Sequence, residues 1–519
     1  MDIRLNASGS RSRIERIEAV VLIAGTVSMG LEILAGRIVA PEYGSSIYTW
    51  GSIIGVFLTG LSLGYYRGGR RSEASYYGIF RLLLFATVYV SVVIATGEST
   101  LSVFELLPLP PRFESLPAIA VLFGPPSYLL GSIVPIATEI TAKEETREAS
   151  GDIFAVSTVG SILGAFLTTF VLIPSLSIRA IGVLFGLMLV AAAVISVYPP
   201  DRGSLLPVAF VLLIVVAGLP LGNAVDETRF SGDTVYSTQT EYQRLTVVDE
   251  DGVRTLYLDG HPQSATYLND SRRHHVWSYT KYFHLPLLIQ NDTKRVLFIG
   301  GGGFTGPKAF VSTYDDVEVD VVEIDPAVIE TAKTYFGVNE SDRLNIYNQP
   351  GRDYLSETQK EYDLIVVDAY RKDKVPFQMT TREFSSLVRS KLTDDGVMLA
   401  NVIAAPEGEA SRFYRSEYRT FDTVFPQTYA FRTSETDRVQ NIEIVATKRS
   451  DRLSESELRS LSRNRDVGVN LSHEIRGYIH DVDANTSETP VLYDDRAPVS
   501  RLLDPAISEK YVVEPSSAS

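Results

Sequence analysis

The sequence predicts a two-part protein: an N-terminal α-helical bundle that crosses a membrane, followed by a C-terminal α/β domain. Three observations support this fold class. Apolar runs of about 20 residues, the length that crosses a hydrocarbon core, fill the chain up to Val225. Beyond them, short apolar strands alternate with amphipathic helices, which is typical of a doubly wound sheet. The charge divides at the same place, with a net charge of −1 up to Val225 and −14 after it.

The first part is expected to be a multi-pass bundle in the cell membrane, in contact with the lipid bilayer. Glycines recur within its apolar runs, and small residues let helices pack closely in lipid. We expect one transmembrane domain over residues 1–225. Hydropathy predicts about seven spans, at residues 17–39, 47–66, 77–97, 118–141, 153–173, 178–198 and 205–222.

The second part begins with a β-hairpin signal. "EYQRLTVV" and "VRTLYLDG" are strand-like and are joined by "DEDG", a turn that contains glycine. We therefore expect a small β-hairpin subdomain over residues 226–268. Helical periodicity over residues 274–289 follows it. We expect the rest of the chain, residues 269–519, to form a methyltransferase-like Rossmann domain.

The Rossmann prediction depends on strands and helices that alternate along the chain. A parallel sheet of this kind is covered on both faces and binds its ligand at the carboxyl ends of its strands. Helices are expected after the first strand through Phe310, over 327–336 and over 381–392. The predicted strands are 295–300, 319–325, 343–348, 362–368 and 396–403.

Four strand ends carry the chemistry. The glycine turn Gly300–Gly303 lets backbone N–H groups approach a ligand. Glu323 ends the second strand, where an acid can accept two ribose hydroxyls. A purine is expected near the end of the third strand, at 349–353. Asp368 ends the fourth strand and is expected to face the crevice.

Composition excludes several classes of site. The chain has no cysteine, so it has no disulfide, thiolate metal site or cysteine nucleophile, and its six histidines form no i, i+4 pair. We therefore expect no metal. The acidic balance argues against nucleic-acid binding. Only 11 of the 48 basic residues are lysine, a composition that resembles proteins of haloarchaea and indicates a halophilic source.

Several motifs in order resemble the spermidine synthase family of polyamine aminopropyltransferases. The "LEILAGRIVAPEYGSSIYTWGSIIG" stretch is similar to its membrane-fused branch. The soluble likeness runs from about residue 240 to residue 403. The matching motifs are "EYQ" with Tyr242 and Gln243, "LYLDG" followed by Gln263, "HLPLL", "VLFIGGGG", "VEIDP" with Asp325, "DLIVVDAY" with Tyr370, and "VLYDDRAPV" near the C-terminus.

The resemblance implies transfer of an aminopropyl group from decarboxylated S-adenosylmethionine to a small-molecule amine, with release of methylthioadenosine and no metal. It makes Asp368 the base that takes the amine proton. The implied substrate pocket contains Tyr242, Tyr267, Tyr279 and Tyr370. The implied cofactor site contains Gln243, Gly300, Gly301, Gly302, Gly303, Glu323, Asp325, Gly351 and Asp353. A homodimer is a candidate assembly.

Three departures from the family pattern weaken the case for a diamine acceptor. Gly303 stands where the family has an aspartate that holds the donor's amino end, and Arg371 stands where it has a second diamine-binding acid. Pro350 replaces the adenine-contacting aspartate and leaves Asp353 as a substitute. Each lost charge-assisted hydrogen bond is worth roughly 1.5–3 kcal/mol, and an arginine would repel a dication. A neutral, monoamine or anionic acceptor is therefore expected.

Other functions stay open at the level of sequence. An S-adenosylmethionine-dependent methyltransferase shares the sheet, although such enzymes commonly have an acid where this chain has Phe298. A dinucleotide enzyme fits G-x-G-x-x-G through Gly301, Gly303 and Gly306, but no second mononucleotide half follows. A transporter or sensor with a non-catalytic nucleotide- or polyamine-binding domain is a third alternative.

The sidedness of the soluble domain is predicted in two conflicting ways. Arginines before the first span and after the second are cytoplasmic by the positive-inside rule, so seven spans put the C-terminal half outside. An adenosyl sulfonium cofactor is made in the cytoplasm. We expect a cytoplasmic domain, with one segment such as the proline-rich stretch 117–135 re-entrant.

Overall fold

The computed structural model separates the chain into two compact units, Met1–Ser231 and Gly232–Ser519. The residues that it describes are 2–43, 47–70, 74–104, 107, 109–144, 148–227, 230–240, 242–269, 275–290, 292–372, 375–480, 482, 486–507 and 509–516.

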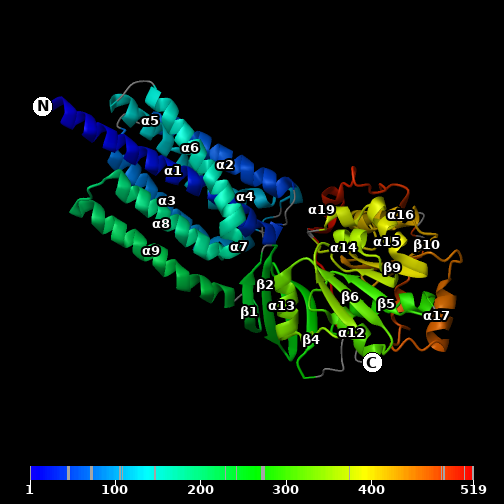
Figure 1. Ribbon diagram of the computed structural model, residues 1–519. Helices are drawn as coiled ribbons and strands as arrows, with labels where there is room; N and C mark the ends of the chain where they lie inside the picture. The colour runs from blue at the N-terminus through cyan, green and yellow to red at the C-terminus, as the bar shows by residue number, and fades with distance from the viewer. Residues whose placement is uncertain are drawn as a thin grey trace. The chain divides into compact units, whose positions relative to one another are not determined.

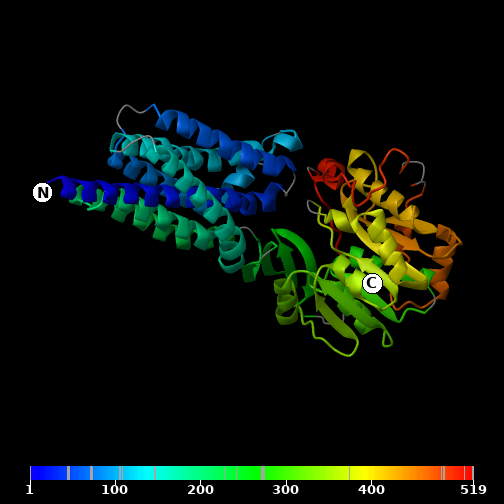
Figure 2. The same ribbon diagram turned by 45° about the horizontal axis from the view of Figure 1, so that its top comes forward.

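The first unit is built of long apolar helices that run side by side (Figure 2). A π-helical turn, Thr168–Leu172, continues the sixth helix. The helices are α1 (Asp2–Tyr43), α2 (Ile47–Gly68), α3 (Tyr76–Phe104), α4 (Ser115–Gly131), α5 (Ile133–Glu144), α6 (Glu148–Leu167), α7 (Ile173–Ser175), α8 (Ile178–Ser196) and α9 (Arg202–Glu227).

Six helices of the described residues are long and apolar enough to cross a membrane, so the count of seven is not confirmed. They coincide with the first six predicted spans and lie at Glu15–Ala40, Ile47–Gly68, Tyr76–Gly97, Ser115–Ala142, Gly151–Ser175 and Ile178–Ser196. The seventh predicted span falls on α9, where the described apolar stretch is Arg202–Val216. The helix α9 itself continues to Glu227.

The proline-rich segment is a pair of consecutive helices. The predicted span 118–141 contains a break at Ser132, where α4 passes into α5. Pro135 has no N–H to donate to the carbonyl of Gly131, which explains the break. Both helices pack into the apolar core of the unit.

Close helix packing holds this unit together, as the recurrent glycines predict. A Cβ on Gly160 of α6 would lie 2.3 Å from the carbonyl oxygen of Leu22 on α1. A Cβ on Gly64 of α2 would lie 2.4 Å from the carbonyl oxygen of Tyr128 on α4. Larger residues at either position would push the helices apart.

The second unit starts with a four-stranded antiparallel sheet rather than a lone hairpin. Its strands, in spatial order, are β1 (Asp233–Gln239), β2 (Arg244–Glu250), β3 (Val253–Leu258) and β4 (His261–Tyr267). The predicted hairpin is β2–β3. Hydropathy missed β1 and β4 because these edge strands are polar and mostly exposed or half-buried.

A seven-stranded sheet forms the centre of the unit. Five strands are parallel, in the order β9-β8-β5-β6-β7, and β11 pairs antiparallel with β9 and β10. The sheet is therefore mixed, with two strands beyond the five predicted. The strands are β5 (Arg295–Ile299), β6 (Glu318–Glu323), β7 (Leu344–Asn348), β8 (Tyr362–Val367), β9 (Leu392–Ala404), β10 (Gln427–Arg432) and β11 (Gln440–Thr447).

Helices cover both faces of this sheet and bury two separate apolar cores. Figure 1 shows α14, α15 and α16 together on one face. His274 lies outside the described residues, and the rest of the predicted helix 274–289 contains two short helices, because Pro286 has no N–H to donate to the carbonyl of Tyr282. The helices are α10 (Tyr279–Tyr282), α11 (Pro286–Ile289), α12 (Thr305–Thr313), α13 (Pro326–Tyr335), α14 (Gly351–Glu357), α15 (Arg382–Lys391), α16 (Arg412–Asp422), α17 (Glu455–Asn464) and α19 (Val499–Ile507).

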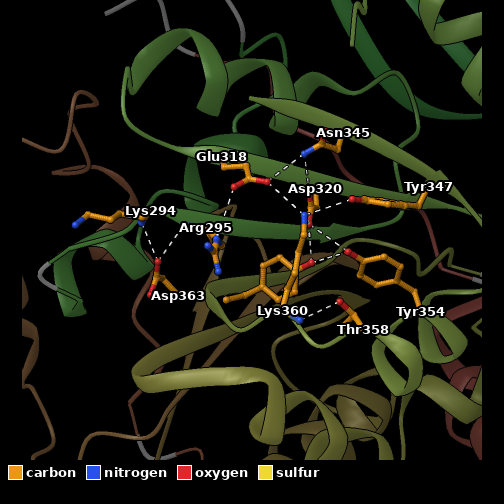
Figure 3. A network of polar contacts seen from close by, with 11 residues as sticks. Lys294, Arg295, Glu318, Asp320, Asn345, Tyr347, Tyr354, Thr358, Lys360 and Asp363 are labelled. Carbon is orange, nitrogen blue, oxygen red and sulfur yellow. Dashed lines mark hydrogen bonds and ion pairs between the residues drawn. The ribbon is translucent and has the colours of Figure 1, made fainter. Parts of the chain in front are cut away.

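A buried polar network joins the strands of the sheet around Asp320 of β6 (Figure 3). Only 1% of Asp320 is exposed. Its Oδ2 accepts hydrogen bonds from Tyr362 (2.7 Å), Tyr354 (3.1 Å) and the Lys360 Nζ (2.7 Å). Its Oδ1 accepts one from Asn345 of β7 at 2.9 Å. This carboxylate therefore ties β6 to β7, β8 and α14.

Candidate functional site

The glycine turn brings three strand ends together. Gly300 and Gly302 have φ values of +99° and +50°, a region that favours glycine. A Cβ on Gly300 would lie 2.3 Å from the backbone oxygen of Asp368, so the end of β5 touches the end of β8. The Gly301 N–H donates a hydrogen bond to Glu323 Oε2 at 2.8 Å, which joins the turn to the end of β6.

Glu323 is a buried carboxylate held by backbone N–H groups. Its Oε1 accepts a hydrogen bond from the Asp325 N–H at 3.0 Å, and its Oε2 accepts from Gly301. Burial raises the pKa of Glu323 above its ordinary value, and the N–H groups partly offset that effect. Each oxygen keeps a lone pair, so the carboxylate can still accept two hydroxyl groups.

A cavity of about 700 Å³ opens beside these strand ends. It lies where β5 separates β6 from β8, the point at which strand order reverses in a doubly wound sheet. Its volume is within the range of small-molecule sites, roughly 300–1,000 Å³. The predicted residues that line it are Tyr242, Gln243, Tyr279, Gly300, Gly301, Gly302, Glu323, Gly351, Asp353, Asp368 and Tyr370.

Three predicted site residues, Gly303, Asp325 and Tyr267, are not among the described residues that line the cavity. Tyr267 lies at the end of β4, opposite Val253 of β3. Gly303 is buried, and a Cβ there would lie 2.7 Å from Ser264 Oγ and 3.1 Å from Phe336. A side chain at this position would crowd Ser264 and Phe336.

Asp325 supports the site from outside the cavity. It caps α13 by accepting a hydrogen bond from the Ala327 N–H, and it also accepts one from Thr240 Oγ1 at 2.6 Å. The same Thr240 oxygen accepts the N–H groups of Tyr242 and Gln243, both at 3.0 Å. Asp325 therefore fixes the loop that carries two cavity residues, and it does not face the ligand space.

Asp368 faces the cavity from the end of β8. Burial raises its pKa to about 6, although the hydrogen bond that its Oδ1 accepts from Asn401 lowers it. That bond is 2.8 Å long. A carboxylate that is half protonated near pH 6 can take a proton from a substrate at neutral pH.

Arg371 forms an ion pair, so its charge would repel a dication less than the sequence alone predicts. Its Nη1 lies 2.8 Å from Asp259 Oδ2 and 3.2 Å from Gln243 Oε1. Only 8% of Arg371 and 9% of Asp259 are exposed. The Arg244 N–H donates a further bond to Asp259 Oδ1 at 2.8 Å. The guanidinium charge at the cavity wall is therefore largely balanced.

An aromatic and amide wall completes the cavity, and three of its residues were missed at the level of sequence. Trp277, Asn401 and Tyr511 all line the cavity. The Trp277 ring stacks on Tyr279, with ring centroids 6.2 Å apart. No sequence motif distinguishes these residues, which come from a loop, the last part of β9 and the C-terminal segment. Aromatic faces of this kind attract cations.

The two buried phenols of the wall are anchored through their hydroxyl groups. Tyr279 donates to the Gln263 carbonyl at 3.2 Å, and Tyr370 donates to the Met379 carbonyl at 2.8 Å. Burial raises the pKa of both tyrosines well above its ordinary value. They are therefore neutral and present their rings, not a charge. Among the described residues, no group of three or more His, Asp or Glu side chains could hold a metal.

The strand order, the glycine turn and the acid at the end of β6 define a methyltransferase-like α/β fold. Residues 278–432 match the spermine/spermidine synthase domain. The chain is 27% identical to the polyamine aminopropyltransferase of Vibrio vulnificus, over 38% of this chain and 67% of that protein. These matches support the spermidine synthase family for the second unit.

A second relative extends the similarity beyond the α/β domain. The chain is 24% identical to polyamine aminopropyltransferase 2 of Aquifex aeolicus, over 69% of this chain and 72% of that protein. The aligned length of 378 residues exceeds the second unit, so the alignment reaches into the helical unit. The spermidine synthase of Thermotoga maritima superposes with a TM-score of 0.39 at 22% identity, covering 49% of this chain and 86% of that structure.

Proposed function

We propose that the second unit transfers an aminopropyl group from decarboxylated S-adenosylmethionine to an amine, releasing methylthioadenosine. The domain match and the relatives named polyamine aminopropyltransferases support this reaction. The observation that carries the proposal is the position of Asp368. Its carboxylate lines the cavity between the glycine turn and the aromatic wall and has a pKa near 6.

The donor would be held by the glycine turn and the acids beside it. Gly300 and Gly351 line the cavity, so their backbone N–H groups would lie close to the donor. Glu323 would accept the ribose hydroxyls of the donor. Asp353, in the first turn of α14, would face its adenine ring. The bound donor supplies an electrophilic carbon beside a positively charged sulfur.

Asp368 would act as the general base. The Asn401 amide already occupies Oδ1, so Oδ2 is the oxygen that takes the proton from the amine. As that proton leaves, the amine nitrogen forms a bond to the carbon and the carbon–sulfur bond breaks, which releases neutral methylthioadenosine. An aliphatic amine has a pKa near 10, so it needs such a base at neutral pH.

The proposed acceptor carries one ammonium group and an uncharged remainder. In family members the second ammonium of a diamine meets a second acid, and here Arg371 occupies that position. The cavity lining also contains aromatic and amide side chains: Trp277, Tyr279, Tyr511 and Asn401. These groups offer a cation one set of aromatic faces and one carboxylate, Asp368.

Freeing Asp259 should change the acceptor preference. We expect Arg371→Gln to raise the affinity for putrescine roughly tenfold, because the change leaves a buried carboxylate without its charged partner. Isothermal titration calorimetry of the purified protein measures the affinity. The matched control is Arg371→Gln with Asp259→Asn, which removes both charges and should leave the affinity for putrescine as in wild type. Equal affinity in all three proteins would refute the proposed acceptor site.

The reaction is tested by incubating the purified full-length protein with decarboxylated S-adenosylmethionine and a panel of mono- and diamines. Release of methylthioadenosine with a monoamine supports the proposal. Consumption of S-adenosylmethionine with methylation of a substrate would identify a methyltransferase instead. Binding of donor or amine without any product would favour a transporter or sensor.

We also propose that the first unit spans a membrane and that the second unit lies in the cytoplasm, where adenosyl donors are made. The six apolar helices support the first statement. An assembly as a homodimer stays a prediction.

Sidedness can be measured because the chain has no cysteine. Ser456 is exposed on α17, so Ser456→Cys introduces a single reactive thiol in the second unit. We expect a membrane-impermeant maleimide to label it only after the cells are lysed. Wild-type protein, which has no thiol, is the control for background. Labelling in intact cells would place the unit outside.

A further inference from the structure

Asp368 is the end of a chain of four polar side chains. Tyr511 Oη donates to Asn441 Oδ1 at 2.7 Å, and Asn441 Nδ2 donates to Asn401 Oδ1 at 2.8 Å. Asn401 Nδ2 then donates to Asp368 Oδ1 at 2.8 Å. The four groups come from the end of β8, the last part of β9, the start of β11 and the C-terminal segment.

The direction of every bond in this chain follows from the carboxylate. Ionised Asp368 can only accept, so Asn401 must turn its amino group toward it. The Asn401 carbonyl oxygen then faces Asn441 and needs a donor, which fixes the Asn441 amide in the same sense. The Asn441 carbonyl oxygen in turn takes the hydroxyl proton of Tyr511. One orientation satisfies all four groups, and reversing either amide would set two acceptors against each other.

The chain is buried and its far end is anchored. Only 3% of Asn401 and 2% of Asn441 are exposed, so water cannot replace their bonds cheaply. The segment that carries Tyr511 is paired to the protein through its backbone. Val512 N–H donates to the Val439 carbonyl at 2.9 Å, and Ser278 N–H donates to the Glu514 carbonyl at 2.9 Å.

We propose that Asn441 and Tyr511 are positioning residues for Asp368: they hold the Asn401 amide so that it donates to one carboxylate oxygen, which favours the ionised form and leaves the other oxygen facing the cavity. The effect of these hydrogen bonds on the ionisation of Asp368 does not depend on which reaction the protein catalyses. The use of Asp368 as a base rests on the proposed function. Tyr511 extends this control to the C-terminal segment, which no motif of the sequence connects with the site.

The other titratable groups near Asp368 do not supply this effect. Glu443 lies opposite Asn401 on the neighbouring strand and is fully buried. Burial raises the pKa of Glu443 well above its ordinary value, and the charge of Asp368 adds to the rise. Burial also raises the pKa of Tyr279 and of Tyr511. Arg371, three residues along the chain, is paired with Asp259.

The test measures the titration of Asp368 directly. Infrared spectra of the full-length protein are recorded across pH, and the carboxyl band that is missing in Asp368→Asn is assigned to Asp368. We expect a midpoint near pH 6 in wild type. Asn441→Leu should raise the midpoint by about one pH unit, because it removes the donor that orients Asn401. Tyr511→Phe, the milder change, should raise it by roughly a few tenths of a unit.

Tyr414→Phe is the matched control. Tyr414 is also buried and its hydroxyl also donates a hydrogen bond to a carbonyl, that of Pro406, but among the described residues it makes no hydrogen bond to Asp368, Asn401, Asn441 or Tyr511. The titration midpoint of Asp368 in Tyr414→Phe should equal that in wild type. A midpoint that is unchanged in folded Tyr511→Phe and Asn441→Leu proteins would overturn the proposal. If the midpoints shift but no variant, nor wild type, releases methylthioadenosine, the chain of bonds stands and the proposed reaction fails.

Discussion

Asp368→Asn is expected to abolish aminopropyl transfer while leaving the protein folded. Loss of a general base lowers rates by roughly 10²- to 10⁴-fold. The asparagine keeps the size of the side chain, so donor binding should persist. Methylthioadenosine release measures the rate, and calorimetry with the donor checks that the site is intact. Retention of wild-type activity would show that the proton leaves by another route.

The same substitution should stabilise the protein at neutral pH. Burial raises the pKa of Asp368 from 3.8 in its ordinary state to about 6. The contribution of this group to folding is therefore fully present below about pH 4 and is lost as pH rises through 6. Asp368→Asn should unfold at a higher temperature than wild type at pH 8, and the difference should shrink at pH 4. A difference independent of pH would contradict the raised pKa.

Asp320→Ala is expected to destabilise the second unit by about 3–5 kcal/mol, the cost of leaving buried partners of a charge unpaired. Two tyrosine hydroxyls, one lysine and one asparagine amide lose an acceptor at once (Figure 3). Hydrogen exchange of the β6 and β7 amides measures the loss as faster exchange in these strands.

Glu318→Ala is the control for that prediction. Glu318 lies on the same strand and contacts the same Lys360 at 3.3 Å, but its side chain is 36% exposed. Exposed ion pairs contribute about 1 kcal/mol or less, so exchange should change little. Equal effects of the two substitutions would mean that the network around Asp320 does not stabilise the sheet.

The positions of the strand-end residues could be predicted because they depend on local patterns. The turn Gly300–Gly303 and the acids Glu323 and Asp368 each follow an apolar strand, and parallel strands align their carboxyl ends at one edge of a sheet. Glu323 accordingly bonds to Gly301, and Asp368 touches Gly300. The apolar runs of the first unit were equally readable, and six of them form helices long and apolar enough to cross a membrane.

The partners of these residues could not be predicted, since they lie far along the chain. Asp259 neutralises Arg371 across 112 residues, so an arginine that reads as repulsive in the sequence is an ion pair in the fold. Asn441 reaches Asn401 across 40 residues and Tyr511 reaches Asn441 across 70.

By itself, then, the sequence determined two units, a sheet that binds its ligand at the carboxyl ends of its strands, and the carboxylates at those ends. Hydrophobic periodicity, turn residues and strand length are local properties of the chain. Only the tertiary structure decided which charges are balanced, that a side chain at residue 303 would crowd Ser264 and Phe336, and that the C-terminal segment reaches the hydrogen-bond chain that ends at Asp368. These depend on side chains that meet across strands and loops, and the free energy of a buried charge is set by those neighbours rather than by its own position in the sequence.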